Sequence, residues 1–261
     1  MDYRTFDPPD DVQDIVRFWW TLDDPNPGAA PHRLMAETCP NLVVIRKGSF
    51  TEADGNPASK VHLAGPLGRA ADNTAHGPFR IFGIYLWPWA VPVLFRREAA
   101  EALDRFIAFS TLRADLDPMA LVTAEEDKVR ELAVDLIREA RTVTPRDHLI
   151  EQAVRYMVSE KGSVPVEELA ASYGLARRQF ERRFNICTGF SPALFQRILR
   201  FQRTYHLLES GAARNLTELA LEAGYFDQSH FIRDFKRFGG MDPKQYFRQA
   251  PAKVDNFVRL P

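Results

Sequence analysis

The sequence predicts an α+β protein with a β-rich, barrel-like N-terminal domain that ends in helices. A C-terminal all-α domain follows, made of two helix-turn-helix units joined by a long helix. Three observations predict this fold. Residues 1–92 hold short apolar segments separated by turn formers, which is typical of sandwiches and barrels. From Arg96 onward, apolar residues recur at helical spacing. In the last third, one pattern of helix, glycine turn and helix occurs twice.

The composition favours a water-soluble protein with two domains. The chain has 261 residues, of which 45% are hydrophobic, enough to bury a sizeable core. No apolar run is long enough to span a bilayer, and the acidic N-terminus lacks the apolar core of a signal peptide. Two cysteines far apart in sequence, Cys39 and Cys187, suit a reducing compartment. These features predict a cytoplasmic location and no membrane association.

The charge is divided unevenly between the two halves. Residues 1–145 hold 16 Lys and Arg against 22 Asp and Glu, a net charge of −6. Residues 146–250 hold 16 against 12, a net charge of +4. A basic half beside an acidic half indicates a polyanion as partner of the basic half, although ordinary surface variation would give a split of similar size.

In the N-terminal half we expect strands at residues 15–20, 42–45 and 81–87, where apolar residues cluster between Pro- and Gly-containing turns. After Arg96 a helix is expected that places Ala99, Leu103, Phe106 and Ile107 on one face. Thr123 and Glu126 have the spacing of a capping box and predict the start of the next helix. We assign residues 1–141 to a sensor or dimerisation domain, with these helices as a candidate dimer face.

The second domain is predicted at residues 145–250, followed by a tail at 251–261. Thr144 is a suitable N-cap and Pro145 suits the first helical position, so a helix is expected at 145–160. Pro165 starts a short helix, and Ser191 with Pro192 starts a long helix that ends near residue 210. Asn215 and Glu218 have the spacing of another helix start.

The repeated pattern defines the two units. The first copy comprises Leu169, Ala170, Gly174, Phe180, Phe184, Gly189, Pro192 and Phe195. The second comprises Leu219, Ala220, Gly224, Phe231, Phe235, Gly240, Pro243 and Tyr246. The two phenylalanines of each unit are four residues apart, so they share the buried face of the second helix. Each unit therefore presents a polar outer face on that helix.

These outer faces carry side chains that can read DNA. In the first unit they are Arg177, Arg178, Glu181 and Arg182, and in the second Gln228, Ser229 and Arg233. Arginine matches the major-groove edge of guanine, glutamine matches adenine, and glutamate can accept from cytosine. Arg237 is expected to contact the phosphate backbone, which positions without specifying sequence. If the long helix holds the two reading helices about 34 Å apart, one monomer spans one turn of double-stranded DNA.

At these residues the chain resembles the DNA-binding domain of AraC/XylS-type transcriptional regulators. The most specific segment is residues 220–231, followed by Phe235-Lys236-Arg237 and Gly240-Met241-Asp242-Pro243. The resemblance covers roughly residues 146–250 and implies base-facing roles for the positions named above. One departure is Ala176, where the family usually has serine or a similar cap, so the first reading helix starts less firmly.

The N-terminal half resembles such regulators less specifically. They often carry a cupin-like barrel that binds a small effector, but His32, His62 and His76 here form no His-x-His metal pattern. The segments 63–66 and 83–88 instead resemble an uncharacterised β-rich domain found fused to these regulators. Four tryptophans could line an effector pocket or fill the core: Trp19, Trp20, Trp87 and Trp89.

The sequence is compatible with three functions. The chain is a transcription regulator that responds to a small-molecule effector, or a ligand-independent regulator whose N-terminal domain only dimerises, or a DNA-repair-type enzyme. The sequence predicts no enzyme, because it has no catalytic motif and lacks the cysteine cluster that the repair reading requires. No cofactor and no metal is predicted. A homodimer is compatible with the pattern, and double-stranded DNA is the expected partner.

Overall fold

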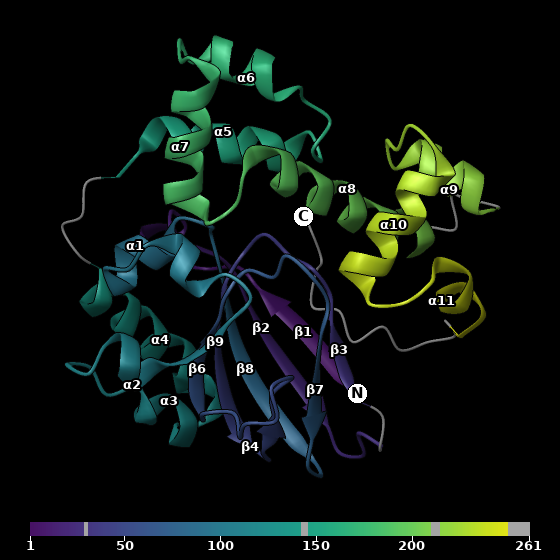
Figure 1. Ribbon diagram of the computed structural model, residues 1–261. Helices are drawn as coiled ribbons and strands as arrows, with labels where there is room; N and C mark the ends of the chain where they lie inside the picture. The colour runs from purple at the N-terminus through teal and green to yellow at the C-terminus, as the bar shows by residue number, and fades with distance from the viewer. Residues whose placement is uncertain (29–30, 142–145, 210–214, 250–261) are drawn as a thin grey trace.

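The computed structural model describes residues 1–28, 31–141, 146–209 and 215–249. Figure 1 shows a β-rich N-terminal half whose upper end lies against a helical C-terminal half. The α+β prediction is confirmed, and so is the order of a β-rich region followed by helices.

The N-terminal half contains two antiparallel sheets. The larger has the order β1 (Asp2–Phe6), β2 (Val16–Asp24), β8 (Phe79–Leu86), β4 (Asn41–Lys47), β6 (Val61–Ala64) and β9 (Phe106–Ala108). The smaller has the order β3 (His32–Leu34), β7 (Ala71–Ala75) and β5 (Phe50–Thr51). A short 3-10 helix, η1 (Asp10–Val12), lies between β1 and β2. Among the described residues the strands form two open sheets rather than the closed, barrel-like arrangement that was expected.

The larger sheet buries both of its faces. Successive side chains of a strand point to opposite faces. Trp19, Phe82 and Ile84 join the core that continues under the helices. Trp20 and Ile81 belong to a second cluster on the opposite face, which faces the smaller sheet. The apolar runs that predicted these strands are thus explained by burial on two sides.

The segment between the sheets and the C-terminal half departs from the expected helices. It contains α1 (Ala90–Phe95), η2 (Ala99–Ala102), α2 (Phe109–Leu112), α3 (Met119–Thr123) and α4 (Glu126–Ala140). Phe106 and Ile107 lie in β9, the edge strand of the larger sheet, because their backbone pairs with β6. The predicted capping box is also wrong: Thr123 ends α3, and the N-cap of α4 is Glu125.

The C-terminal half is all α, as predicted. Its helices are α5 (His148–Ser159), α6 (Val166–Ser172), α7 (Arg177–Thr188), α8 (Pro192–Glu209), α9 (Leu216–Glu222), α10 (Gln228–Gly239) and α11 (Pro243–Gln249). The predicted cap at Thr144 and Pro145 lies outside the described residues. α5 begins later than expected, at His148, because the Asp147 side chain accepts a hydrogen bond from the Ile150 N–H.

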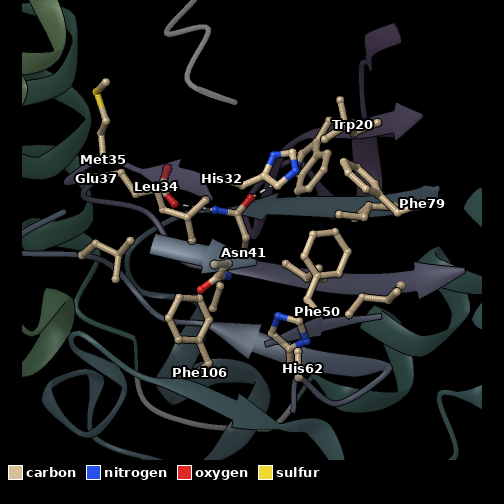
Figure 2. A pocket seen from close by; sticks show the side chains of 18 residues that line it. Trp20, His32, Leu34, Met35, Glu37, Asn41, Phe50, His62, Phe79 and Phe106 are labelled. Atoms are coloured by element: carbon tan, nitrogen blue, oxygen red, sulfur yellow. Dashed lines mark hydrogen bonds between the residues drawn. The ribbon is translucent and has the colours of Figure 1, made fainter. Parts of the chain in front are cut away.

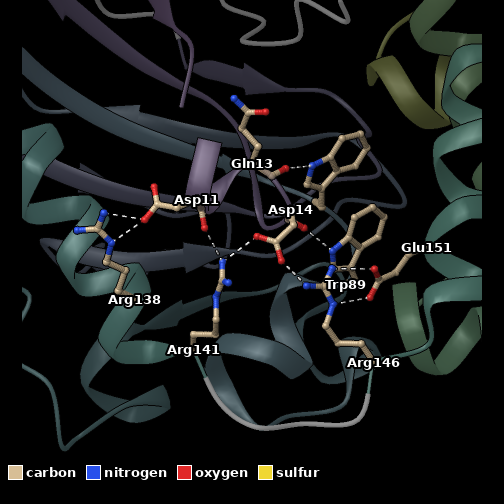
Figure 3. A network of polar contacts seen from close by, with 9 residues as sticks. Asp11, Gln13, Asp14, Trp89, Arg138, Arg141, Arg146 and Glu151 are labelled. Atoms are coloured by element: carbon tan, nitrogen blue, oxygen red, sulfur yellow. Dashed lines mark hydrogen bonds and ion pairs between the residues drawn. The ribbon is translucent and has the colours of Figure 1, made fainter. Parts of the chain in front are cut away.

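An ionic network joins the two halves (Figure 3). Asp14 pairs with Arg141 at 2.7 Å and with Arg146, which also pairs with Glu151 of α5 at 2.7 Å. The indole N–H of Trp89 donates to the Asp14 carbonyl at 2.8 Å. The loop that carries Asp14 therefore holds the start of α5 against the sheet domain. None of the helices in the described ranges is long and apolar enough to cross a membrane.

Candidate nucleic-acid interface

The first helix-turn-helix unit is formed by α6 and α7. Gly174, at φ 66°, occupies the turn between them, and the Leu175 N–H donates to the Ala170 carbonyl at 3.0 Å. Phe180 and Phe184 are fully buried, as their spacing predicted. The N-cap of α7 is Ala176, which has extended backbone angles but no side-chain hydrogen bond. The start of this helix lacks the cap that a serine would provide, as the sequence indicated.

The outer face of α7 carries two kinds of arginine. Arg178 and Arg182 are exposed to solvent. Arg177 is also exposed but is ion-paired, with Glu181 at 2.8 Å and with Glu167 of α6. Those contacts offset the charges of Arg177 and Glu181, so Arg178 and Arg182 are better placed to meet an incoming polyanion.

Arg183 anchors α7 inside the domain. Its guanidinium donates two hydrogen bonds to the Asp147 carboxylate, at 2.6 and 2.7 Å. Burial opposes ionisation of Asp147, but the bonds from Arg183 and from the Ile150 N–H lower the pKa of that carboxyl. One carboxylate therefore caps α5 and fixes the orientation of α7 on it. The sequence pattern did not reveal this pair, because the two residues are 36 positions apart.

The second unit is formed by α9 and α10. Asn215 caps α9 by accepting from the Glu218 N–H at 2.9 Å, as predicted. Asp227 caps α10 by accepting from the His230 N–H at 2.7 Å. Phe231 and Phe235 are fully buried, which confirms their predicted place in the core. The predicted base-reading side chains of α10 are all exposed: Gln228, Ser229 and Arg233.

A buried ion pair positions α10 on the long helix α8. The Asp234 carboxylate is 0% exposed, and the Arg197 guanidinium donates to it at 2.5 and 3.3 Å. His230 lies next to this pair, with Nε2 at 3.5 Å from Asp234, and its ring meets the Tyr225 ring edge-on. Figure 1 shows α7 near one end of α8 and α10 near the other. A separation of one DNA turn stays a prediction.

The C-terminal end of α10 is docked on the N-terminal half. The last carbonyl groups of a helix lack partners within the helix. Here the Ala36 N–H donates to the Phe238 carbonyl at 2.8 Å, and the Ala70 N–H to the Arg237 carbonyl at 3.2 Å. The Arg237 side chain donates to the Gly68 carbonyl at 3.4 Å. The predicted phosphate contact Arg237 thus lies at the junction of the two halves.

The N-terminal half holds a pocket between its two sheets (Figure 2). A relay of polar side chains runs along one side: the Trp20 N–H donates to Asn41 at 3.0 Å, and the Asn41 amide donates to Glu37 at 2.7 Å. Burial raises the pKa of Glu37 to about 8. Of the four tryptophans, Trp20 lines this pocket, whereas Trp19 and Trp89 fill the core.

Known proteins match the two halves separately. A helix-turn-helix domain model matches residues 169–249, and a domain of unknown function, DUF6597, matches residues 4–108. The regulator MtrA of Neisseria gonorrhoeae is 29% identical over 106 residues, which are 41% of this chain and 34% of MtrA. The transcriptional activator RhaS of Klebsiella pneumoniae is 30% identical over 78 residues, 30% of this chain and 28% of RhaS. Residues 169–249 are an AraC-type helix-turn-helix domain.

The AraC-type domain accounts for the two helix-turn-helix units and for their buried phenylalanines. The DUF6597 match over residues 4–108 agrees with the resemblance of the N-terminal half to an uncharacterised β-rich domain. The chain matches about a third or less of the length of these curated relatives, which are regulators by name. In the described ranges, no three His, Cys, Asp or Glu residues are grouped so that they could hold a metal ion.

The chain was also matched to solved structures. ToxT of Vibrio cholerae is 9% identical, with a TM-score of 0.49, and the match covers 97% of this chain and 100% of that one. The DNA-binding domain of AdpA, solved in complex with a target DNA, is 28% identical with a TM-score of 0.34. That match covers 37% of this chain and 87% of the AdpA domain.

Proposed function

We propose that the chain is a sequence-specific, DNA-binding transcription regulator that responds to a small-molecule effector. The observation that carries the proposal is the pair of AraC-type units. In each unit the second helix packs on a buried core and exposes a polar face to solvent. Helix-turn-helix proteins place the N-terminal turns of such a helix in the major groove. In α7 and α10 these turns point away from the buried phenylalanines and remain open to solvent.

The reading residues follow from this arrangement. Arg178 and Arg182 of α7, with Arg177 and Glu181 beside them, would contact one groove segment. Gln228, Ser229 and Arg233 of α10 would contact the next. Arg237 would add phosphate contact, and affinity would then fall with rising salt as counterions are released.

The N-terminal half would sense the effector. The pocket of this half lies between the two sheets. Backbone N–H groups of the same half donate to the C-terminal end of α10, so the two halves are physically connected. We assign residues 1–141 to this domain and residues 145–250 to the DNA-binding domain, in a cytoplasmic protein. We also propose that two chains associate as a homodimer, which light scattering would detect as a doubled mass.

The experiment is recovery of genomic DNA fragments bound by the purified protein, followed by affinity measurement with the enriched site. Arg178→Ala should weaken binding to that site by about 1–3 kcal/mol and relax the preference at one base pair. Binding to random DNA should change much less. Arg97→Ala is the matched control, because it removes an exposed arginine of the N-terminal half and should leave DNA affinity unchanged. Equal weakening on specific and random DNA would rule out base reading by Arg178.

A further inference from the structure

The pocket between the two sheets has room for a small molecule. The space open to the centres of water molecules is about 90 Å³. A single water needs only about 10–15 Å³ by the same measure. Apolar and aromatic side chains form most of its wall, with aromatic rings from Trp20, Phe50, Phe79 and Phe106. The pocket thus suits a ligand with a compact hydrophobic body.

The charge of the lining is one-sided. Among the described residues that line the pocket, Glu37 is the only acidic one, and none is a lysine or an arginine. A carboxylate or phosphate ligand would meet no lysine or arginine in this wall, and its charge would oppose ionisation of the Glu37 carboxyl. The lining therefore disfavours anions.

Several polar atoms of the lining can accept a hydrogen bond from a ligand. The Nδ1 atom of His62 lies 2.8 Å from the Ser59 carbonyl, which can only accept, so Nδ1 carries the hydrogen. Burial lowers the pKa of His62, which leaves the ring neutral and Nε2 as an acceptor. The buried Oδ1 atom of Asn73 has no hydrogen-bond partner in the described protein. The Trp20 N–H, which could serve a ligand as donor, is already donated to Asn41.

We propose that this pocket binds a small hydrophobic amine, with its apolar body between the aromatic rings and its N–H groups donated to Glu37, His62 or Asn73. Aromatic faces attract a cationic nitrogen, and a desolvated site strengthens that attraction. An ammonium group would also stabilise the ionised form of Glu37. The inference rests on the proposed function in one respect, since it takes this pocket as the effector site.

The position of Glu37 connects this pocket to the DNA-binding half. Glu37 and Leu67 both line the pocket, and their backbones pair through two hydrogen bonds of 2.9 Å. The adjacent Ala36 N–H is the group that donates to the Phe238 carbonyl of α10. A ligand that shifts Glu37 or Leu67 would therefore shift a residue that holds the second reading helix.

Calorimetric titration of the full chain with three isosteric probes tests the ligand class: 2-phenylethylamine, 2-phenylethanol and phenylacetate. The amine should bind at least about tenfold more tightly than phenylacetate, because of these two probes the amine can donate to the acceptors of the lining and the carboxylate cannot. Glu37→Gln should weaken amine binding by about tenfold or more and change the affinity for the alcohol little. Glu131→Gln, an exposed substitution on α4, is the matched control.

The proposal would be overturned if phenylacetate bound as tightly as the amine, or if none of the three probes bound. Unchanged amine affinity in a folded Glu37→Gln protein would also overturn it. If that variant does not fold, Asn73→Ala takes its place, with the same expected loss of amine affinity. DNA binding by the unliganded protein is measured separately. A protein that binds DNA but no amine would contradict the ligand proposal alone, and a protein that binds the amine but no DNA would contradict the DNA-binding function alone.

Discussion

The buried pair of Arg197 and Asp234 should respond unequally to removal of its two partners. Asp234 is 0% exposed in the wild type, and Arg197→Ala would leave its carboxylate with His230 Nε2, at 3.5 Å, as the remaining ion-pair neighbour among the described residues. An uncompensated buried charge costs about 3–5 kcal/mol. Arg197 also lies over the Phe238 ring at 5.5 Å, and loss of that contact adds about 0.5 kcal/mol. We therefore expect Arg197→Ala to lower the free energy of unfolding by about 3.5–5.5 kcal/mol.

Asp234→Ala should cost less. The arginine that remains is 33% exposed in the pair and can be solvated by water. The loss is then close to that of hydrogen bonds to a charged group, about 1.5–3 kcal/mol. The double variant, with both Arg197→Ala and Asp234→Ala, has no buried unpaired carboxylate, so it should be more stable than Arg197→Ala alone.

Urea unfolding, monitored by the far-ultraviolet circular dichroism of the helices, would give these free energies of unfolding. The control is Arg97→Ala, which removes an exposed i, i+4 pair with Glu101 and should cost about 0.5 kcal/mol or less. The reasoning would be refuted if Arg197→Ala were no more destabilising than Asp234→Ala, or if it matched the Arg97→Ala control.

Three further substitutions test other parts of the molecule. Ala176→Ser should stabilise the protein by about 0.5–2 kcal/mol, because α7 has extended N-cap angles but no side-chain cap; thermal unfolding measures it. Gly65→Ala should destabilise by about 1–3 kcal/mol or more in urea unfolding, because a Cβ there would lie 1.7 Å from the Ala102 carbonyl oxygen. Glu37→Gln should raise the melting temperature at pH 8 but not at pH 5. Burial raises the pKa of Glu37 from 4.5 to about 8, so the wild type loses stability as pH rises through that range.

Each of these has a matched control and an opposing result. Ala171→Ser places serine inside α6 and should not stabilise; equal gains at both positions would contradict the capping argument. Gly68→Ala puts a Cβ only in ordinary contact, 3.6 Å from Asp104, so it should be tolerated. Gly65→Ala being equally mild would show that the backbone there can move freely. For the pH series the control is Glu131→Gln, and a Glu37→Gln gain that persists at pH 5 would argue against a raised pKa.

The repeat, and the packing that follows from it, could be predicted from the sequence. Phe180 and Phe184 are four residues apart, as are Phe231 and Phe235, so each pair lies on one face of its helix. All four side chains are buried. The Asn215 cap was also predicted, because its partner is only three residues away. Patterns of this kind can be predicted because the interacting residues lie within one helical turn of each other.

Other features could not be predicted, because their partners are remote in sequence. Phe106 and Ile107 fit a helical face, but pairing with β6 decided their conformation. Thr123 with Glu126 matched a capping box, yet α3 continues through Thr123. The division of strands into two sheets depends on register and pairing between distant segments, which apolar runs alone do not specify.

The attachment of α10 to the N-terminal half was hidden for a further reason: two of its hydrogen bonds join backbone groups. Ala36 and Ala70 donate N–H groups to the end of α10, and any residue other than proline could do the same. Backbone donors leave no mark in a pattern of side chains. The glycine at position 240, by contrast, is visible in the sequence, and its φ of 72° suits the end of a helix.

Both reading helices are attached to the N-terminal half at the same end. The C-terminal cap of α7, Gly189, is so close to η2 that a Cβ there would lie 3.0 Å from the Ala99 carbonyl oxygen. The C-terminal end of α10 accepts hydrogen bonds from Ala36 and Ala70. Base contacts in helix-turn-helix proteins come from the N-terminal turns. The attachment therefore leaves the reading turns accessible while connecting their helices to the sheet domain. Because each helix is rigid over its 12 residues, a shift at the attached end must move the reading end as well.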